Sequence, residues 1–315
     1  MTRPIANPAH APARTRRRQR PSSLLRSALL AALAVTCLCA GPTVIGALRG
    51  SLPQVPGPGR VEGQVTLSGL ESGACMSFAP SLGQAPKTVF IDPGHGGLDP
   101  GVVGESGGQT VLEKDVALAV ATRLAALLQG DGYRVVLSRT KDTSVTSLAA
   151  ADSVSGALTA SAEHRDLLAR AACANAANAS ALLSIHFDAF GDPSVGGTET
   201  FYDGARPFAS DSKRLASDLQ DALVSALGTR DRGIWTDDQL VAPTLTPSGS
   251  KYGHLIELGP AEPGYVEDPS TMPGALVEPL FLTNAAEAGL ASGASGQQRI
   301  ATALRDGLEG YLAGS

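Results

Sequence analysis

Aromatic residues are scarce in this sequence, at 4% of 315 residues, which argues against the stacking platforms that bind single-stranded nucleic acid. The four cysteines are too few to form the disulfide scaffold of a chain this long. Glycine and proline are common, at 36 and 21 residues, but follow no G-X-Y period, which excludes collagen. With 43% hydrophobic and 17% charged residues, the chain is too apolar to be disordered and can bury a core.

Acidic residues are absent from the first 60 positions, which contain nine arginines and no lysine. The remaining positions hold 16 basic and 30 acidic residues, out of 25 and 30 in the whole chain. Because this remainder is acidic, we expect no nucleic-acid partner. The basic charge lies in an N-terminal tail, where it can serve as a targeting signal.

An uncharged stretch from Ser27 to Leu48 follows six arginines that lie between positions 14 and 26. A basic region followed by an apolar one is typical of a secretory signal peptide. The 22 apolar residues are also long enough to span a bilayer, so an uncleaved N-terminal anchor stays a second interpretation. We assign residues 1–50 to this signal peptide or anchor. The rest is then exported to the cell envelope (periplasm, cell wall or medium), and touches the membrane only through this segment.

Residues 51–86 are rich in Gly, Pro and Ser, which predicts a linker or poorly structured lead-in. Outside the signal, the cysteines are Cys75 and Cys173. Export places both in an oxidising space, so we favour a disulfide between them over two isolated buried thiols. Such a bond would attach the lead-in to the domain that follows.

Strands alternate with helices from residue 87 onward. Strands are predicted at 88–91, 133–138, 181–185, 198–202 and 274–282, and helices at 112–129, 163–178, 212–227 and 297–312. This alternation predicts an α/β fold with a twisted, mixed, mainly parallel sheet of about six strands, covered by helices on both faces. We place it in a single catalytic domain, residues 87–315. Residues 143–161 read as an inserted loop.

Ionisable side chains follow the ends of several predicted strands. His95 lies in the Gly-rich turn DPGHGG, His186 follows the strand ALLSI, and Glu278 interrupts an otherwise apolar strand. Because sites in open α/β sheets form at the carboxyl ends of strands, these side chains can converge. Glu113 opens the predicted helix 112–129 and lies on its apolar face, where a carboxylate needs a partner.

Two histidines and one carboxylate form a known catalytic zinc set, which leaves one position open for water. We predict one zinc ion per chain, held by His95, Glu113 and His186, with Glu278 as general base. Taken singly, His186 and Glu113 are better explained as a hydrogen-bonded core histidine and a first-turn helix acid. The sequence has no H-E-x-x-H motif, which disfavours thermolysin-like proteases.

Four sequence blocks contain these residues in order: VFIDPGHGGLDPG, LEKDVALAVATRLAALL, HRDLLARAACANAANASALLSIHFDAF and MPGALVEPLFLTNAAEAGL. Through them the chain, from about Lys87 to the C-terminus, resembles the zinc-dependent N-acetylmuramoyl-L-alanine amidases, the type-3 catalytic domain that cuts bacterial peptidoglycan. The resemblance implies hydrolysis of the amide between the lactyl group of N-acetylmuramic acid and L-Ala of the stem peptide. The partner would be peptidoglycan or muropeptide fragments, and we expect a monomer.

The segment from Leu240 to Thr271 is longer than the usual link into the last block. It carries Glu257 in the strand-like run LIEL, which makes this residue a rival of Glu278. We prefer Glu278 because its surroundings fit the family block better. His164 and His254 are interpreted as structural or surface residues, the first on a solvated charged helix face.

Two other functions stay open. A zinc carboxypeptidase or amidohydrolase would cleave another small amide, including peptides without muramic acid. A non-catalytic module would bind the wall without releasing stem peptides, although the complete four-residue set argues against it. Arg232 is a candidate substrate contact. Trp235 and Tyr252 can pack on glycan or on the core, and we favour the core.

Overall fold

The computed structural model describes residues 59–83, 87–240 and 244–314. The predicted signal peptide or anchor, residues 1–50, lies outside these ranges, as does the start of the predicted lead-in. No helix within the described ranges is long and apolar enough to cross a membrane.

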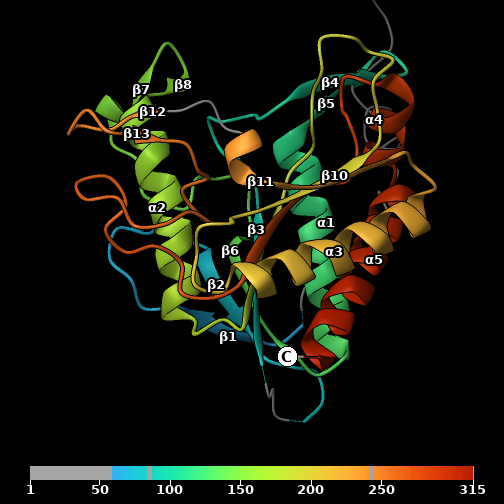
Figure 1. The fold of residues 1–315 in the computed structure, drawn as a ribbon, viewed down its shortest axis with the longest axis horizontal. Coiled ribbons are helices and arrows are strands. Elements are labelled where there is room, and N and C mark those ends of the chain that lie inside the picture. The colour runs from blue at the N-terminus through green and yellow to red at the C-terminus, as the bar shows by residue number, and fades with distance from the viewer. Residues whose placement is uncertain (1–58, 84–86, 241–243, 315) are drawn as a thin grey trace, which may run out of the picture. The chain divides into compact units, whose positions relative to one another are not determined.

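An eight-stranded mixed sheet forms the centre of the fold (Figure 1). In spatial order its strands are β1 (Val61–Gln64), β2 (Ala74–Phe78), β6 (Arg134–Arg139), β3 (Thr88–Pro93), β9 (Ala181–Ile185), β14 (Gly274–Glu278), β10 (Thr198–Tyr202) and β11 (Asp231–Thr236). The central strands β6, β3, β9 and β14 are parallel, whereas β2 and β10 run antiparallel to their central neighbours. The predicted mixed, mainly parallel α/β fold is confirmed, with eight strands in place of about six.

Helices cover both faces of this sheet (Figure 1). One face carries α1 (Glu113–Gly130), α3 (Ala209–Leu227) and α5 (Ala294–Ala313), and the other carries α2 (Ala160–Ala176). A further helix, α4 (Ala285–Ser292), packs against α5 and against β4 (Val103–Ser106). Each helix predicted from the sequence is present, and α4 is additional.

The alternation of side chains along β3 shows how one sheet fills two cores. Val89 and Ile91 point to the face of α1, α3 and α5, whereas Phe90 points to the face of α2. On α1, Val120 and Leu124 follow at helical spacing and are fully buried in the first core. A strand buried on both faces reads as a continuous apolar run, which is why the central strands were recognisable in the sequence.

The lead-in contributes more structure than its composition predicts. Within residues 59–83, β1 and β2 form an antiparallel pair, and β2 also pairs with β6, so the lead-in extends the main sheet. This differs from the poorly structured linker expected over residues 51–86. A disulfide joins Cys75 of β2 to Cys173 of α2, with Cα atoms 5.8 Å apart, and it confirms the predicted pair. Both residues are fully buried.

Short hairpins occupy three of the connections. They pair β4 with β5 (Gln109–Leu112), β7 (Ser153–Val154) with β8 (Ala157–Leu158), and β12 (Thr244–Leu245) with β13 (Lys251–Tyr252). The β7–β8 hairpin lies in the predicted insertion 143–161, next to a 3-10 turn at Ala150–Asp152. The run LIEL forms a turn, in which the Leu255 carbonyl accepts hydrogen bonds from the amides of Leu258 and Gly259. It is not the strand that its apolar residues suggest.

Candidate metal centre and active site

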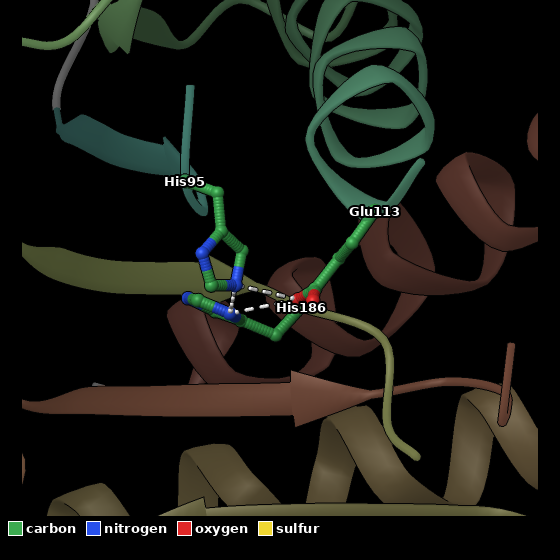
Figure 2. Close-up of side chains that lie close together, drawn as sticks. All are labelled: His95, Glu113 and His186. Carbon is green, nitrogen blue, oxygen red and sulfur yellow. Dashed lines mark hydrogen bonds and ion pairs between the residues drawn. The ribbon is translucent and has the colours of Figure 1, made fainter. Parts of the chain in front are cut away.

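The predicted metal ligands meet at one edge of the sheet. His95 follows β3, His186 follows β9, and these two strands are adjacent and parallel, so their carboxyl ends lie together. Glu113 is the first residue of α1. Figure 2 shows the three side chains pointing at one another from these separate elements. The topology of the sheet therefore brings together residues up to 91 positions apart in the sequence.

The three candidate ligand atoms lie almost equally far from one another. His95 Nε2 is 3.1 Å from His186 Nδ1, and each of these nitrogens is 3.0 Å from Glu113 Oε1 (Figure 2). All three residues belong to a group whose ligand atoms fit around a single ion. Ligands about 2.0–2.1 Å from a tetrahedral zinc are separated by little more than 3 Å, so this spacing suits such an ion.

Neighbouring groups fix the orientation of His95. Its backbone has a positive φ of 61°, and its Nδ1 lies 2.7 Å from Asp99 Oδ2, which leaves Nε2 directed at the other ligands. A carboxylate on the outer nitrogen of a metal-binding histidine selects the tautomer and raises ligand basicity. Burial lowers the pKa of His95, but the hydrogen bonds to Asp99 and Glu113 outweigh burial and raise this pKa to about 9.

The loop that carries His95 is held by two buried arginines. Arg139 donates to the carbonyl oxygens of Pro93 and Gly94, at 2.9 and 2.8 Å, and Arg170 Nη2 donates to that of His95 at 2.8 Å. Gly94 is required here because a Cβ at this position would collide with the ring of His186. The loop geometry thus depends on charged side chains contributed by β6 and α2.

Glu113 is fixed through both of its carboxylate oxygens. Oε2 accepts a hydrogen bond from the Val102 amide at 2.7 Å, and Oε1 accepts one from the Phe187 amide at 3.0 Å. Burial raises the pKa of Glu113, but hydrogen bonds and charge from His186 and His95 more than offset this and lower the pKa far below its usual value. The carboxylate is therefore ionised, which is the form that binds a cation.

Glu278, the last residue of β14, lines the same hollow as the three candidate ligands. Its side chain is 7% exposed, and its Oε2 has no hydrogen-bond partner among the described residues. Burial raises the pKa of Glu278 well above its usual value, and the charges of Glu113, Asp188 and Glu199 raise it further. A carboxyl group with a raised pKa beside a metal-binding set is suited to proton transfer near neutral pH.

Glu257, the rival acid, lies on the other side of the histidines. It lines a different hollow that also reaches His95 and His186. Its Oε1 lies 3.9 Å from Arg170 Nε, and the side chain is 5% exposed. Burial raises the pKa of Glu257 well above its usual value too, and its Oε1 has no hydrogen-bond partner among the described residues. The two acids differ in that Glu257 faces Arg170, whereas no described cation pairs with Glu278.

The remaining predicted residues have mixed outcomes. Tyr252 is buried, as expected, but Trp235 is 40% exposed, so its placement in the core is wrong. Trp235 lies on β11, at the edge of the sheet, where β10 is its one neighbouring strand among the described residues. His254 Nδ1 lies 2.8 Å from Asp203 Oδ2 and 3.3 Å from Asp237 Oδ1, and these three residues form a second group whose ligand atoms could surround one ion.

The ring of His164 stacks on Tyr265 with centroids 4.2 Å apart. The helix face beside it is not simply solvated, because Asp166 is buried and lies 2.8 Å from Arg170. Arg232 lies 3.1 Å from Glu199 and lines a hollow next to the candidate ligands.

Sequence reasoning missed Asp99, Arg139 and Arg170. Asp99 had a detectable signal, because it lies four residues after His95 in the same Gly-rich turn. The two arginines had none, since a single arginine ending a strand or lying within a helix resembles any surface residue. Only the packed structure shows that Arg139 is fully buried and Arg170 is 2% exposed.

Comparisons with known proteins agree with this geometry. A family model described as N-acetylmuramoyl-L-alanine amidase matches residues 89–310. The chain is 34% identical over 225 residues to the amidase LytC of Bacillus subtilis, covering 71% of this chain but only 35% of LytC. It is 31% identical to the germination-specific N-acetylmuramoyl-L-alanine amidase of the same organism, over 74% of this chain and 82% of that protein.

Among solved structures, the CwlD amidase of Clostridioides difficile, determined in complex with the GerS lipoprotein, superposes with a TM-score of 0.57 at 27% identity. The match covers 73% of this chain and 100% of that one. The family model spans every candidate ligand and Glu278, together with the central strands that position them, whereas β1 and β2 precede the match. This chain belongs to the N-acetylmuramoyl-L-alanine amidase family of hydrolases.

Proposed function

We propose that the protein is a zinc-dependent peptidoglycan hydrolase of the cell envelope. It would cleave the amide between the lactyl group of N-acetylmuramic acid and L-Ala of the stem peptide. The observation that carries this proposal is the group of His95, Glu113 and His186, whose ligand atoms lie 3.0–3.1 Å apart in a chain of this family.

The donor set fits zinc. Two imidazole nitrogens and one carboxylate are ligands of catalytic zinc sites, and three protein ligands leave a position for water or substrate. Asp99 behind His95 supplies the outer carboxylate that such sites use. When bound, one zinc ion per chain would supply a Lewis acid that polarises the amide carbonyl and lowers the pKa of water to about 7.

The proton transfers are assigned to Glu278. Its carboxylate would remove a proton from the attacking water, whose oxygen forms a bond to the carbonyl carbon. It would then deliver that proton to the nitrogen of L-Ala as the carbon–nitrogen bond breaks. Its raised pKa supports both steps, because the group must bind and release a proton at the working pH.

The remaining parts of the chain are assigned accordingly. Residues 1–50 would direct export or anchor the protein, and residues 87–315 would form the catalytic domain, with residues 51–86 leading into it. The Cys75–Cys173 disulfide supports export, since such bonds persist in oxidising compartments. The substrate would be peptidoglycan or its muropeptide fragments, and the enzyme would act as a monomer.

The first experiment is to incubate the zinc-loaded full chain with muropeptides and to identify products by mass spectrometry. We expect free stem peptide and intact muramic acid, with activity lost on chelation and restored by zinc. His186→Ala should lose both zinc and activity. Cleavage only of peptides that lack muramic acid would identify a different amidohydrolase, and wall binding without any release would identify a non-catalytic module.

The second experiment separates the two buried glutamates. Glu278→Gln should retain zinc and lose activity by a factor of about 10²–10⁴, the contribution typical of a general base. Glu257→Gln is the matched control, because it removes a similarly buried carboxylate that faces Arg170. If Glu257→Gln abolishes turnover and Glu278→Gln does not, the role of general base belongs to Glu257.

A further inference from the structure

The candidate metal ligands lie between two different hollows. The first, here called the α2 hollow, is lined by Leu167 of α2, by Leu255 and Ile256, and by His95 and His186. The second, the β11 hollow, is lined by Phe190, Arg232, Trp235, Leu240 and Phe281. It also includes Asp188 and Ala189, which line the hollow of Glu278 and the metal ligands. The three hollows therefore follow one another along this edge of the sheet.

Aromatic side chains distinguish the two outer hollows. In the β11 hollow, Phe190 and Trp235 are 55% and 40% exposed, which is unusual for rings of this size. The described residues that line the α2 hollow include leucine and isoleucine but no Phe, Tyr or Trp. Exposed rings offer flat apolar faces with little conformational entropy to lose, and such residues dominate binding energy where a ligand covers them.

The charged residues of the β11 hollow determine which polar groups of a ligand it can bind. Its one cation, Arg232 among the described residues, already lies 3.1 Å from Glu199 Oε2, and its guanidinium stacks 4.8 Å from the centre of the Phe281 ring. Asp188 and Glu199 are the acids of the same hollow. Hydroxyl and acetamido groups of a sugar can donate hydrogen bonds to these acids. Acids also line the α2 hollow, so charge does not select between the two hollows for the peptide arm, and the exposed rings carry the assignment.

We propose that the β11 hollow is a saccharide subsite that stacks the sugar side of the substrate on Trp235 and Phe190, and that the α2 hollow takes the L-Ala side. This assignment rests on the amidase function proposed above. It gives the substrate one direction across the metal centre, because the scissile amide joins the sugar to the peptide. Leu255 and Ile256, from the long link that precedes the last sequence block, then contact the peptide arm.

The test measures the binding of each half of the substrate separately. The probes are a peptide-free disaccharide that ends in N-acetylmuramic acid and a tripeptide that begins with L-Ala. Each is titrated calorimetrically into the zinc-loaded full chain and its variants. Trp235→Ala should weaken disaccharide binding about tenfold and change tripeptide binding less than about twofold. Ile256→Ala should show the reverse pattern.

Two controls keep the test decisive. Leu245→Ala removes an apolar side chain that is 68% exposed on β12 and lines neither hollow, so both affinities should stay unchanged. Trp235→Phe keeps a ring and should retain disaccharide binding within about threefold of wild type. If Trp235→Ala weakens disaccharide binding and Trp235→Phe does not, the loss of affinity is due to the missing aromatic ring.

The assignment is overturned if Trp235→Ala leaves disaccharide binding intact, or if it weakens the tripeptide instead. It is also overturned if the wild-type chain does not bind the disaccharide. Muropeptide hydrolysis by the wild-type chain is measured in parallel. Hydrolysis with no effect of Trp235→Ala would reject the subsite alone, whereas disaccharide binding without hydrolysis would reject the amidase function alone.

Discussion

The two faces of the sheet are stabilised in different ways. The face of α1, α3 and α5 is an apolar core in which residues such as Leu124, Leu219 and Leu304 are fully buried. The face of α2 buries charges in addition to apolar residues, with Arg170 opposed by Asp92, Asp166 and Glu257. The disulfide also lies on this second face.

The difference suggests that one face mainly stabilises the fold, whereas the other also positions the loop of His95. Apolar packing is non-directional and stabilises a face without selecting the place of a single loop. Directional bonds instead locate the candidate ligand His95. Arg170, on the α2 face, donates to the carbonyl oxygen of His95, and Arg139, which also donates to the Lys114 carbonyl of α1, reaches those of Pro93 and Gly94. We therefore expect damage to the apolar face to reduce stability alone, and damage to the charged face to reduce stability and metal affinity together.

The largest effect is expected for Arg170→Met. Removing this cation leaves Asp92 and Asp166 as buried carboxylates without their partner, which costs about 3–5 kcal/mol of unfolding free energy. It also frees the His95 carbonyl, so zinc affinity should fall about 10–100-fold. Denaturant unfolding and competition with a chelator measure the two quantities. Arg214→Met is the control, because it removes an ion pair with Asp211 and contacts with Tyr311 but no bond to residues 93–95. It should leave zinc affinity unchanged and cost about 1–2 kcal/mol of unfolding free energy.

Leu124→Ala tests the apolar face by leaving a cavity in its core. Leu124 is fully buried in the core of α1, so the cavity should cost about 2–5 kcal/mol. Zinc affinity of the folded protein should stay within about twofold of wild type. A large loss of affinity in this variant would contradict the separation between the two faces.

Replacing Cys75 and Cys173 together by Ser tests the covalent link of the α2 face. The bond closes a loop of 98 residues, and its loss should lower the unfolding free energy by about 2–4 kcal/mol. Comparing the oxidised and reduced wild-type protein in the same unfolding assay controls for the effect of the serines. Equal stability of all three forms would show that β2 is held by strand pairing alone.

Asp237→Asn should have the smallest effect, which should appear only in the pH dependence of the unfolding free energy. Burial and the neighbouring Asp203 raise the pKa of Asp237 from 3.8 to about 6. Between these values the folded protein retains a proton that the unfolded chain has lost, so stability falls as pH rises. The variant should lack this fall, which is on the order of 1 kcal/mol after solvent screening. Asp238→Asn, an exposed neighbour, should keep the wild-type profile in thermal unfolding.

Secondary-structure elements and site residues could be predicted where the sequence pattern that marks them is local. The central strands and the long helices are continuous or periodic apolar segments, and His95, Glu113, His186 and Glu278 each stand at the end of such an element. Strands β1 and β2 were missed because four- and five-residue strands in a Gly/Pro-rich segment depend on pairing with β6, far along the chain.

The supporting shell of the site could not be predicted for the same reason. The roles of Arg139 and Arg170 are defined by the carbonyl groups they reach, which lie 45 to 77 positions away. The turn at Glu257 was mistaken for a strand because a short apolar run carries too little information to distinguish the two. For the two arginines, long-range contacts define a role that the local sequence leaves open.

Strand β11 ends the sheet, and among the described residues its one strand partner is β10. An open edge of this kind invites pairing with another molecule. Here the register shifts between Thr198 and Glu199, and Asp231 and Arg232 place opposite charges at the start of the strand. Irregular, charged edges resist intermolecular strand addition, so the protein can keep Trp235 accessible in solution without becoming a template for aggregation.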